Sequence, residues 1–218
     1  MSGVTQATFM NQRSFGEPAP TVIGQAYGGG FYAGQIGVSS VATHYLVVAP
    51  VSSGQATRQW KNANTATTGA DSIIDGPQNT ADIVADGNST VYPAAHFCND
   101  LVIGGFSDWY MPARNELEVC YFNLKPGTAS NNTSSGINAN AVPARTVNYT
   151  AGNPAQTSAT DFQTGNAEAF SVSSPANYWT STEDSSITAE GTNMPSGNQS
   201  SFGKSYSYRV RGIRRVPV

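Results

Sequence analysis

The sequence predicts an α+β domain in which short antiparallel strands and two helices are joined by long polar loops. Strand-like runs occupy the first quarter and the end of the chain, and two stretches between residues 93 and 124 have the apolar spacing of amphipathic helices. Residues 128–177 show no periodicity and are dense in Asn, Thr, Ser, Ala and Gly. Strands and helices that are segregated along the chain in this way are typical of the α+β class.

Charged residues make up only 11% of the 218 residues, about half the share found in an ordinary soluble domain. Disordered chains are normally rich in charge and poor in aromatic residues, whereas here aromatic residues reach 10% and the net charge is −3. We therefore expect a folded protein with a mostly uncharged surface. Such a surface can hydrogen-bond to sugars or to neighbouring subunits, and it lacks the basic character that general nucleic-acid binding requires.

Residues 1–22 are interpreted as an N-terminal arm that contacts a neighbouring subunit, and residues 23–218 as the domain proper. Pro18 and Pro20 stiffen the end of the arm. The opening residues lack a basic segment followed by an apolar run, and no stretch approaches the roughly 18 apolar residues of a membrane span. We expect no secretory signal, no membrane insertion and folding in a cytoplasm.

The glycine triplet Gly28-Gly29-Gly30 predicts a turn between strands. Strand-like sequence follows it instead of a helix, which argues against a phosphate-binding loop. Residues 45–50 (YLVVAP) are almost wholly apolar and predict a strand that is buried on both faces.

Two helices are expected in the middle of the chain, each beginning near a proline, the first at Pro93 and the second near Pro112. Both place apolar residues at the spacing of one buried face. These residues are Ala94, Phe97, Cys98 and Leu101 in the first helix and Leu117, Cys120, Tyr121 and Leu124 in the second. Cys98 and Cys120 therefore lie on apolar faces, where they either form a disulfide or remain buried thiols.

Five of the eleven basic residues lie within the last fifteen positions, on strand-like sequence. Because side chains alternate along a strand, Arg209 and Arg211 share one face and Arg214 lies on the other; Arg215 joins the first pair if the strand is unbroken. We expect these arginines to pair with carboxylates of the protein itself or of a sister subunit. An acidic ligand such as a sulfated glycan is the alternative.

No segment has the spacing of a catalytic or metal site. His44 and His96 each stand alone, outside any metal-binding spacing or nucleophile motif. We therefore expect neither enzyme activity nor a cofactor.

Three segments, taken in order, resemble a known family. They are residues 105–117 (GFSDWYMPARNEL), 178–183 (YWTSTE) and 209–215 (RVRGIRR). Together they are similar to the domain of unknown function 1566 family, which includes the C-terminal domain of the Legionella collagen-like adhesin and many phage tail-fibre and other virion proteins. Residues 28–34 (GGGFYAG), 45–50 and 93–98 (PAAHFC) resemble the phage members in particular.

The resemblance implies a C-type-lectin-like fold, frequent trimerisation, and adhesion to host or glycan surfaces. The chain departs from the family at Ala113, where a Thr or Ser usually caps the helix, so the cap must come from elsewhere. It also lacks the Glu-Pro-Asn, Gln-Pro-Asp and Trp-Asn-Asp triplets of calcium-dependent lectins. Glu183 and Asp184 could supply oxygens to a cation, but no recognisable calcium site is expected.

The signature residues are interpreted as structural. We expect Asp108 to accept backbone amides in a turn, and Trp109 and Trp179 to anchor the core with their indole N–H groups hydrogen-bonded. Arg114 and Glu116 are expected to pair with Glu183 or with the C-terminal arginines, of which Arg214 belongs to the signature. A second, weaker set is assigned to ligand contact, because aromatic and arginine side chains can stack on or hydrogen-bond to sugars: Tyr149, Phe162, Phe170, Tyr206, Tyr208, Arg209 and Arg211.

The function expected from the resemblance is that of a homotrimeric phage virion surface protein, assembled in the host cytoplasm. Its loops between residues 126 and 200 would bind a host glycan or surface receptor, as in a tail-fibre adhesin, and its arm would contact other virion proteins. The alternative is a structural virion protein, such as a capsid decoration, tail or connector component, without receptor binding. A bacterial surface adhesin is a third reading, which the missing export signal disfavours.

Overall fold

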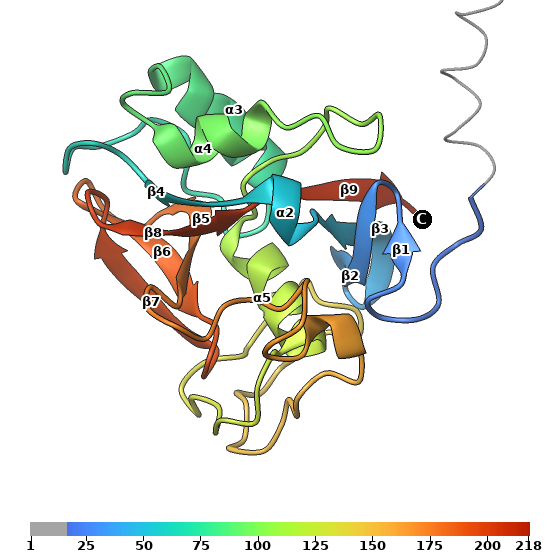
Figure 1. The fold of residues 1–218 in the computed structure, drawn as a ribbon. Coiled ribbons are helices and arrows are strands. Elements are labelled where there is room, and N and C mark those ends of the chain that lie inside the picture. Colours follow the sequence, from blue (N-terminus) through green and yellow to red (C-terminus); the bar gives the residue numbers. More distant parts are fainter. Residues whose placement is uncertain (1–16) are drawn as a thin grey trace, which may run out of the picture.

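A computed structural model describes residues 17–218, and two sheets with helices between and above them make up this part of the chain (Figure 1). The first sheet has the strand order β1-β2-β3-β9 and is antiparallel throughout. Its strands are β1 (Ala26–Tyr27), β2 (Gly30–Val38), β3 (Val41–Val48) and β9 (Ile213–Pro217). The predicted glycine turn is confirmed, because Gly28 and Gly29, with φ of 55° and 81°, connect β1 to β2.

The second sheet has the order β4-β8-β5-β6-β7, with one parallel contact between β5 and β8. Its strands are β4 (Gln55–Gln59), β5 (Asn177–Glu183), β6 (Thr188–Asn193), β7 (Asn198–Gly203) and β8 (Ser207–Arg211). The C-terminal strand is not continuous: Gly212 separates β8 from β9, and the two lie in different sheets. Arg215 therefore does not share a face with Arg209 and Arg211.

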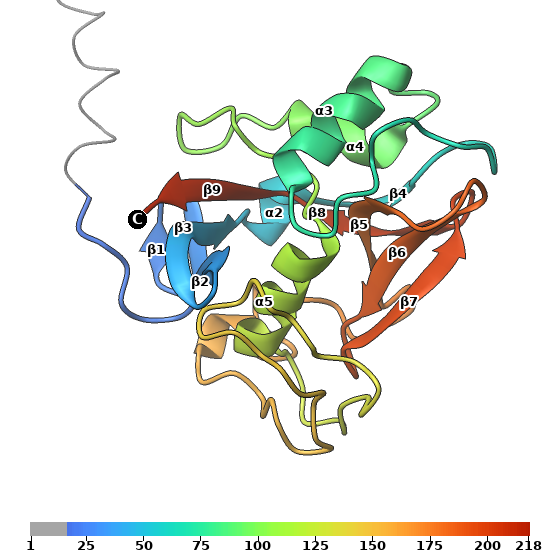
Figure 2. The same cartoon turned by 180° about the vertical axis from the view of Figure 1, so that it is seen from behind.

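Both predicted helices are confirmed as α4 (Pro93–Asn99) and α5 (Arg114–Leu124). The expectation of only two helices is wrong, since the structure adds α3 (Gly76–Asp86), the single turn α2 (Val51–Gly54) and the 3₁₀ turn η1 (Thr160–Phe162). Helix α5 lies between the two sheets, and α3 and α4 cover the second sheet from one side, as both ribbon views show (Figures 1 and 2).

The buried residues form three clusters. The largest surrounds α5 and includes Cys120, the second lies under α3 and α4 around Trp60 and Trp179 and includes Cys98, and the third surrounds Trp109. Cys98 and Cys120 are thus in different clusters, and both are free, buried thiols.

Helix α5 is capped by a neighbouring strand because Ala113 has no side-chain acceptor. Thr182 Oγ1 on β5 accepts the amide of Arg114 at 3.1 Å, and the carbonyl of Ile73 accepts the amide of Asn115 at 2.9 Å. The carboxylate of Glu116 accepts the amide of Ala113 at 2.7 Å. These contacts satisfy the free amides of the first turn and join α5 to both the 72–75 segment and the second sheet.

The long segment between α5 and β5 is mostly loop, as predicted, and its polar side chains bind its own backbone and helix α5. Asn131 Nδ2 donates to the carbonyls of Thr150 and Pro154 at 3.0 and 2.9 Å, and Tyr149 OH donates to Glu118 at 2.6 Å. Asn131 and Tyr149 are buried. Much of the polarity that made this segment look like a binding surface is therefore directed inward.

Most of the proposed arm, residues 1–16, lies outside the described residues. At the start of the described part, Glu17 accepts the amide of Gly28 at 3.0 Å. Among residues 17–218, no helix is long and apolar enough to cross a membrane.

Candidate functional site

Three of the four C-terminal arginines, Arg211, Arg214 and Arg215, pair with carboxylates of the same chain, as predicted, whereas Arg209 does not. Arg214 forms a bidentate ion pair with Asp108, with N–O distances of 2.7 and 2.8 Å. Its guanidinium also stacks on Phe106, 3.8 Å from the centre of the ring. The prediction that Asp108 accepts backbone amides is wrong, because both carboxylate oxygens bind this guanidinium. Asp108 and Arg214 instead fasten β9 to the loop before α5.

Arg211 is a core residue. Its guanidinium, 1% exposed, donates to Glu168 Oε2 at 2.8 Å and to the carbonyl of Ala49 at 2.7 Å, and it lies 4.8 Å from the Phe170 ring centre. Three aromatic residues assigned to ligand contact, Tyr149, Phe162 and Phe170, are also at most 5% exposed. These four side chains pack inside the protein, so an external ligand cannot contact them.

The remaining residues of that set lie at the surface of the second sheet. Tyr206 is 58% exposed, and Tyr208 packs between it and the buried Trp179, with ring centres 5.9 and 5.0 Å away. Arg209 is half-buried and donates to the carbonyl of Pro175 at 2.8 Å. Tyr206 is therefore the one member of the set with a large free ring face.

Of the predicted signature pairs, Glu116 does bind a C-terminal arginine, Arg215, but Arg114 and Glu183 do not bind each other. Arg114 pairs with Glu190 at 3.2 Å, not with Glu183, and Glu183 binds the buried ammonium of Lys204. Lys204 also donates to the carbonyls of Thr65 and Ser186, at 2.8 and 3.0 Å. The tryptophan predictions are confirmed, because the indoles of Trp109 and Trp179 donate to the carbonyls of Phe106 and Arg58 at 3.2 and 3.1 Å.

A shallow, open hollow lies beside Arg215, where β9, β3 and the turn before α3 meet. Two adjoining spaces, of about 130 and 330 Å³, share His44, Asp75 and Arg215. We call them together the Arg215 hollow. Its other lining residues are Ile36, Gly37, Val38, Thr43, Ile74, Pro77, Asp108, Tyr110, Asn140 and Pro217.

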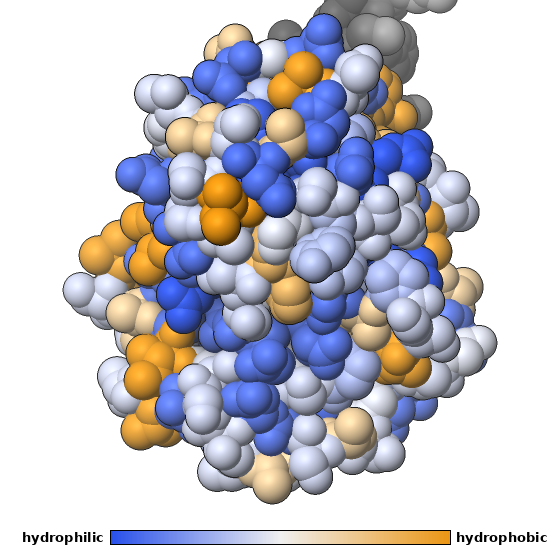
Figure 3. Space-filling view, turned by 90° about the vertical axis from the view of Figure 1, so that its left-hand side faces the viewer, coloured by the Kyte–Doolittle hydropathy of each residue, from blue (hydrophilic) through white to orange (hydrophobic). Residues whose placement is uncertain are grey.

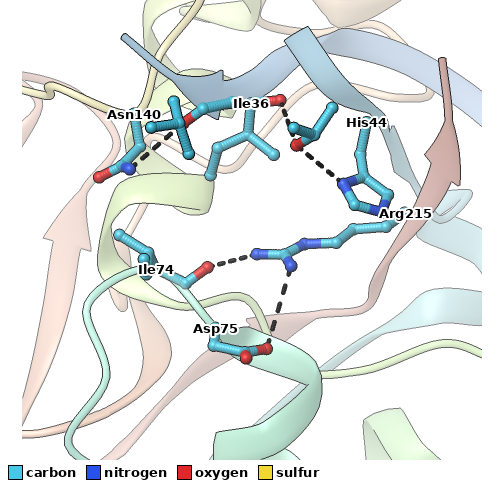
Figure 4. Close-up of a pocket in the computed structure, with 9 residues that line it drawn as sticks. Ile36, His44, Ile74, Asp75, Asn140 and Arg215 are labelled. Carbon is cyan, nitrogen blue, oxygen red and sulfur yellow. Dashed lines mark hydrogen bonds and ion pairs between the residues drawn. The ribbon is translucent and has the colours of Figure 1, made fainter. Parts of the chain in front are cut away.

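Arg215 extends from β9 into the middle of this hollow, with His44 on one side and Asp75 on the other (Figure 4). Its Nε donates to the buried Glu116 at 2.7 Å, and its Nη2 donates to the carbonyl of Ile74. Its Nη1 lies 3.9 Å from Asp75, too far for a hydrogen bond. The guanidinium is thus fixed on one side and keeps donors directed at the open space.

The two flanking side chains are held in place by local structure. Asp75 caps α3, since its Oδ1 accepts the amide of Gln78 at 3.2 Å, and the carboxylate remains 49% exposed. His44 contacts Thr43 Oγ1 through Nδ1 at 3.0 Å. Burial, and next the Arg215 guanidinium, lower the pKa of His44 below its usual 6.5, so the imidazole is neutral at pH 7.

A comparison with known protein families identifies the family to which segments 105–117 and 178–183 belong. The model of the Lcl C-terminal domain matches residues 50–214. The chain belongs to the Lcl C-terminal domain family. Among curated proteins, none matches it.

The Arg215 hollow straddles the boundary of the Lcl C-terminal domain match. Asp75, Asp108, Tyr110 and Asn140 lie within it, whereas residues 36–44 and Arg215 lie outside. The first sheet places these parts together, because β3 pairs with β9 and sets His44 opposite Pro217. This hollow therefore depends on strands that the family match does not cover.

Chemically, the hollow offers a fixed cationic donor, a partly exposed carboxylate and a neutral imidazole between apolar surfaces of Pro77 and Pro217. Within residues 17–218, no three His, Cys, Asp or Glu side chains gather as metal ligands. The sequence indicated that Arg215 would pair with a carboxylate but did not single out His44 or Asp75 as neighbours. An available signal for Asp75 was its place before Gly76-Pro77, which is a helix-start pattern.

Proposed function

We propose that this protein is a non-enzymatic adhesin of a phage virion, and that it binds a host-surface glycan in the Arg215 hollow. The observation that carries the proposal is the arrangement of Arg215 Nη1, Asp75 and His44 around one open space, on two paired strands and a helix cap. Sites that are built on regular elements hold their groups in place before the ligand arrives.

A sugar fits this arrangement better than a charged ligand does. The Arg215 guanidinium is already balanced by Glu116, and Asp75 and Asp108 add negative charge at the rim, so an anion gains little there. Neighbouring hydroxyls can accept from Arg215 and donate to Asp75, while a ring face rests on Pro77 and Pro217. A few polar groups on an apolar wall are typical of small-ligand sites.

The state of the cysteine thiols and of His44 supports the proposed absence of enzyme activity. The thiols of Cys98 and Cys120 are buried, and burial raises the pKa of both, so neither is a thiolate at neutral pH. His44 contacts a threonine hydroxyl on its own strand, and a cationic arginine beside it opposes proton uptake.

The proposal includes a C-type-lectin-like fold and a homotrimer whose residues 1–22 attach to other virion proteins. The fold assignment is supported by the pairing of β3, near the start of the domain, with β9 at its end, and by a helix between two sheets. Trimerisation is inferred from the resemblance to the family, and the virion location from the resemblance of residues 28–34, 45–50 and 93–98 to its phage members.

Cryo-electron microscopy of the intact particle that carries this protein tests the proposal. We expect the domain at a fibre tip or another exposed site, with the Arg215 hollow open to solvent. A domain woven between capsid or tail subunits with the hollow covered would contradict it and would favour the alternative, a structural virion protein without receptor binding.

A further inference from the structure

A row of aromatic side chains runs from the core to the surface at the turn between β7 and β8. Trp179 is buried, and the half-buried Tyr208 lies beside it with ring centres 5.0 Å apart. Tyr206 follows, with its ring centre 5.9 Å from that of Tyr208, and it is 58% exposed. The Tyr206 ring also lies over Gly203, where a Cβ atom would come within 3.3 Å of Tyr206 Cε2. The outermost ring is therefore supported on one side and open to solvent on the other.

Arg58 on β4 lies beside these rings. It pairs with Tyr208 in the β4–β8 register, so both side chains project from the same face of the sheet with their Cβ atoms about 5 Å apart. Its guanidinium lies 5.7 Å from the centre of the Phe97 ring on α4, and Nη1 donates to the carbonyl of Thr57 at 2.9 Å. Because Arg58 is exposed, its Nε and Nη2 donors can be reached from solvent. We call Arg58, Tyr206 and Tyr208 together the Tyr206 platform.

The charge of Arg58 has no partner within the chain. It is the only exposed basic side chain among residues 17–218, and none of the ion pairs in this part of the chain includes it. Residues 1–16 contain no Asp or Glu that could supply a partner. A single unpaired cation on a protein of net charge −3 suits one carboxylate better than a polyanion, which the protein as a whole would repel.

The surroundings of the platform favour a small ligand over a protein partner. The side of the molecule that carries the second sheet is mostly polar, with only isolated apolar patches (Figure 3). A stable protein interface takes about 20–30 residues a side and an apolar centre, whereas the platform offers two rings and one guanidinium. A tyrosine ring face can pack on the C–H face of one sugar ring, and a guanidinium binds a carboxylate through two parallel N–H donors.

We infer that the Tyr206 platform is a second binding site, and that it takes a carboxylated sugar with its ring against Tyr206 and its carboxylate on Arg58. This site shares no residue with the Arg215 hollow. Its strands belong to the second sheet, whereas Arg215 and His44 lie on the first (Figure 1). That the ligand is a sugar rests on the proposed function, whereas the carboxylate and the flat apolar face follow from the platform.

Titration of the full chain with methyl β-glucuronide and, separately, with methyl β-glucoside tests this site, because the two sugars differ in the carboxylate. The ring signals of Tyr206 and Tyr208 are followed by ¹³C–¹H NMR. We expect both signals to shift, with a Kd at least about threefold lower for the glucuronide. Arg58→Gln should abolish that difference. Arg209→Gln, the same change on the opposite face of the β4–β8 pair, should preserve it.

The Tyr206 ring is tested by two further variants, with the Tyr208 signal as the readout. Tyr206→Phe keeps the ring face and should bind both sugars as wild type does, whereas Tyr206→Ala should weaken the binding of both. Unshifted ring signals with both sugars would overturn the inference. Equal Kd values for the two sugars, or an unchanged preference in Arg58→Gln, would also overturn it.

The Asp75→Asn variant separates this site from the proposed function. The Tyr206 and Tyr208 signals should shift in that variant as in wild type, even where glycan binding in the Arg215 hollow is lost or was never present. Loss of the shifts in Asp75→Asn would place the response in the Arg215 hollow and would contradict a separate site on the platform.

Discussion

Arg215 Nε donates to the buried carboxylate of Glu116 at 2.7 Å, and this contact joins the last strand to the start of α5. Glu116 also accepts Tyr110 OH at 2.5 Å and the amide of Ala113 at 2.7 Å. Burial raises the pKa of Glu116, and the Arg215 guanidinium opposes that rise. The same carboxylate therefore caps the helix and fixes the guanidinium at the centre of the proposed glycan site.

Glu116→Gln should destabilise the protein by about 3 kcal/mol, because it leaves Arg215 without its anion and places an NH₂ group against a backbone donor. Denaturant unfolding measures this loss. Asp161→Asn, the same type of change at an exposed position, should stay within about 0.5 kcal/mol of wild type. Equal stabilities of the two variants would show that Glu116 does not organise this region.

Stability should fall as the pH drops below 6.5, in part because of His44. Its pKa is lowered by burial and by Arg215, so the unfolded state takes up a proton at a higher pH than the folded state does. Thermal unfolding of wild type and His44→Gln between pH 7.5 and 5 tests this, and the variant should lose less stability on acidification. An identical pH dependence of the two proteins would mean that His44 is not shielded from water.

Lys204→Met should cost about 3 to 5 kcal/mol, because it leaves the Glu183 carboxylate and two carbonyls without their buried cation. The double variant Lys204→Met/Glu183→Gln should recover part of this loss, because the unpaired charge is then removed as well. Unfolding of both single variants and the double variant gives the coupling energy between the two residues. Purely additive losses would contradict a paired role.

Phe170→Ala should cost about 3 to 5 kcal/mol, since Phe170 is buried against Tyr178 with ring centres 5.2 Å apart. Tyr206→Ala should change stability by no more than about 0.5 kcal/mol, because that ring is mostly exposed. Urea unfolding of the two variants compares these positions, which the sequence alone had placed in one ligand-binding set. A small effect at Phe170 would contradict its place in the core.

The sequence predicted α4 and α5 because each combines a proline near its start with a regular apolar face. It did not predict α3, whose buried side includes polar residues. Asn79 and Thr80 are buried there, and Asn79 donates to the carbonyl of Ser72 while Thr80 donates to that of Met111. Apolar periodicity does not detect a helix that packs through hydrogen bonds.

The candidate site was predicted only in part. Pairing of the C-terminal arginines within the chain followed from charge, but His44, Asp75 and Arg215 are far apart in sequence and meet through the β3–β9 register. The aromatic assignments failed at Tyr149, Phe162 and Phe170 because polar neighbours suggested a surface. In the structure those neighbours bind backbone inside the loops, so local polarity does not indicate exposure.

The most direct test of the central claim is a glycan array probed with multivalent full-length protein, in wild-type, Asp75→Asn and Asp161→Asn forms. Asn at position 75 can still cap α3 but no longer offers a carboxylate to the hollow. We predict that wild type and Asp161→Asn bind the same discrete set of glycans, and that Asp75→Asn binds them at least about tenfold more weakly. Absence of any bound glycan, or equal binding by all three proteins, would contradict glycan recognition in the Arg215 hollow.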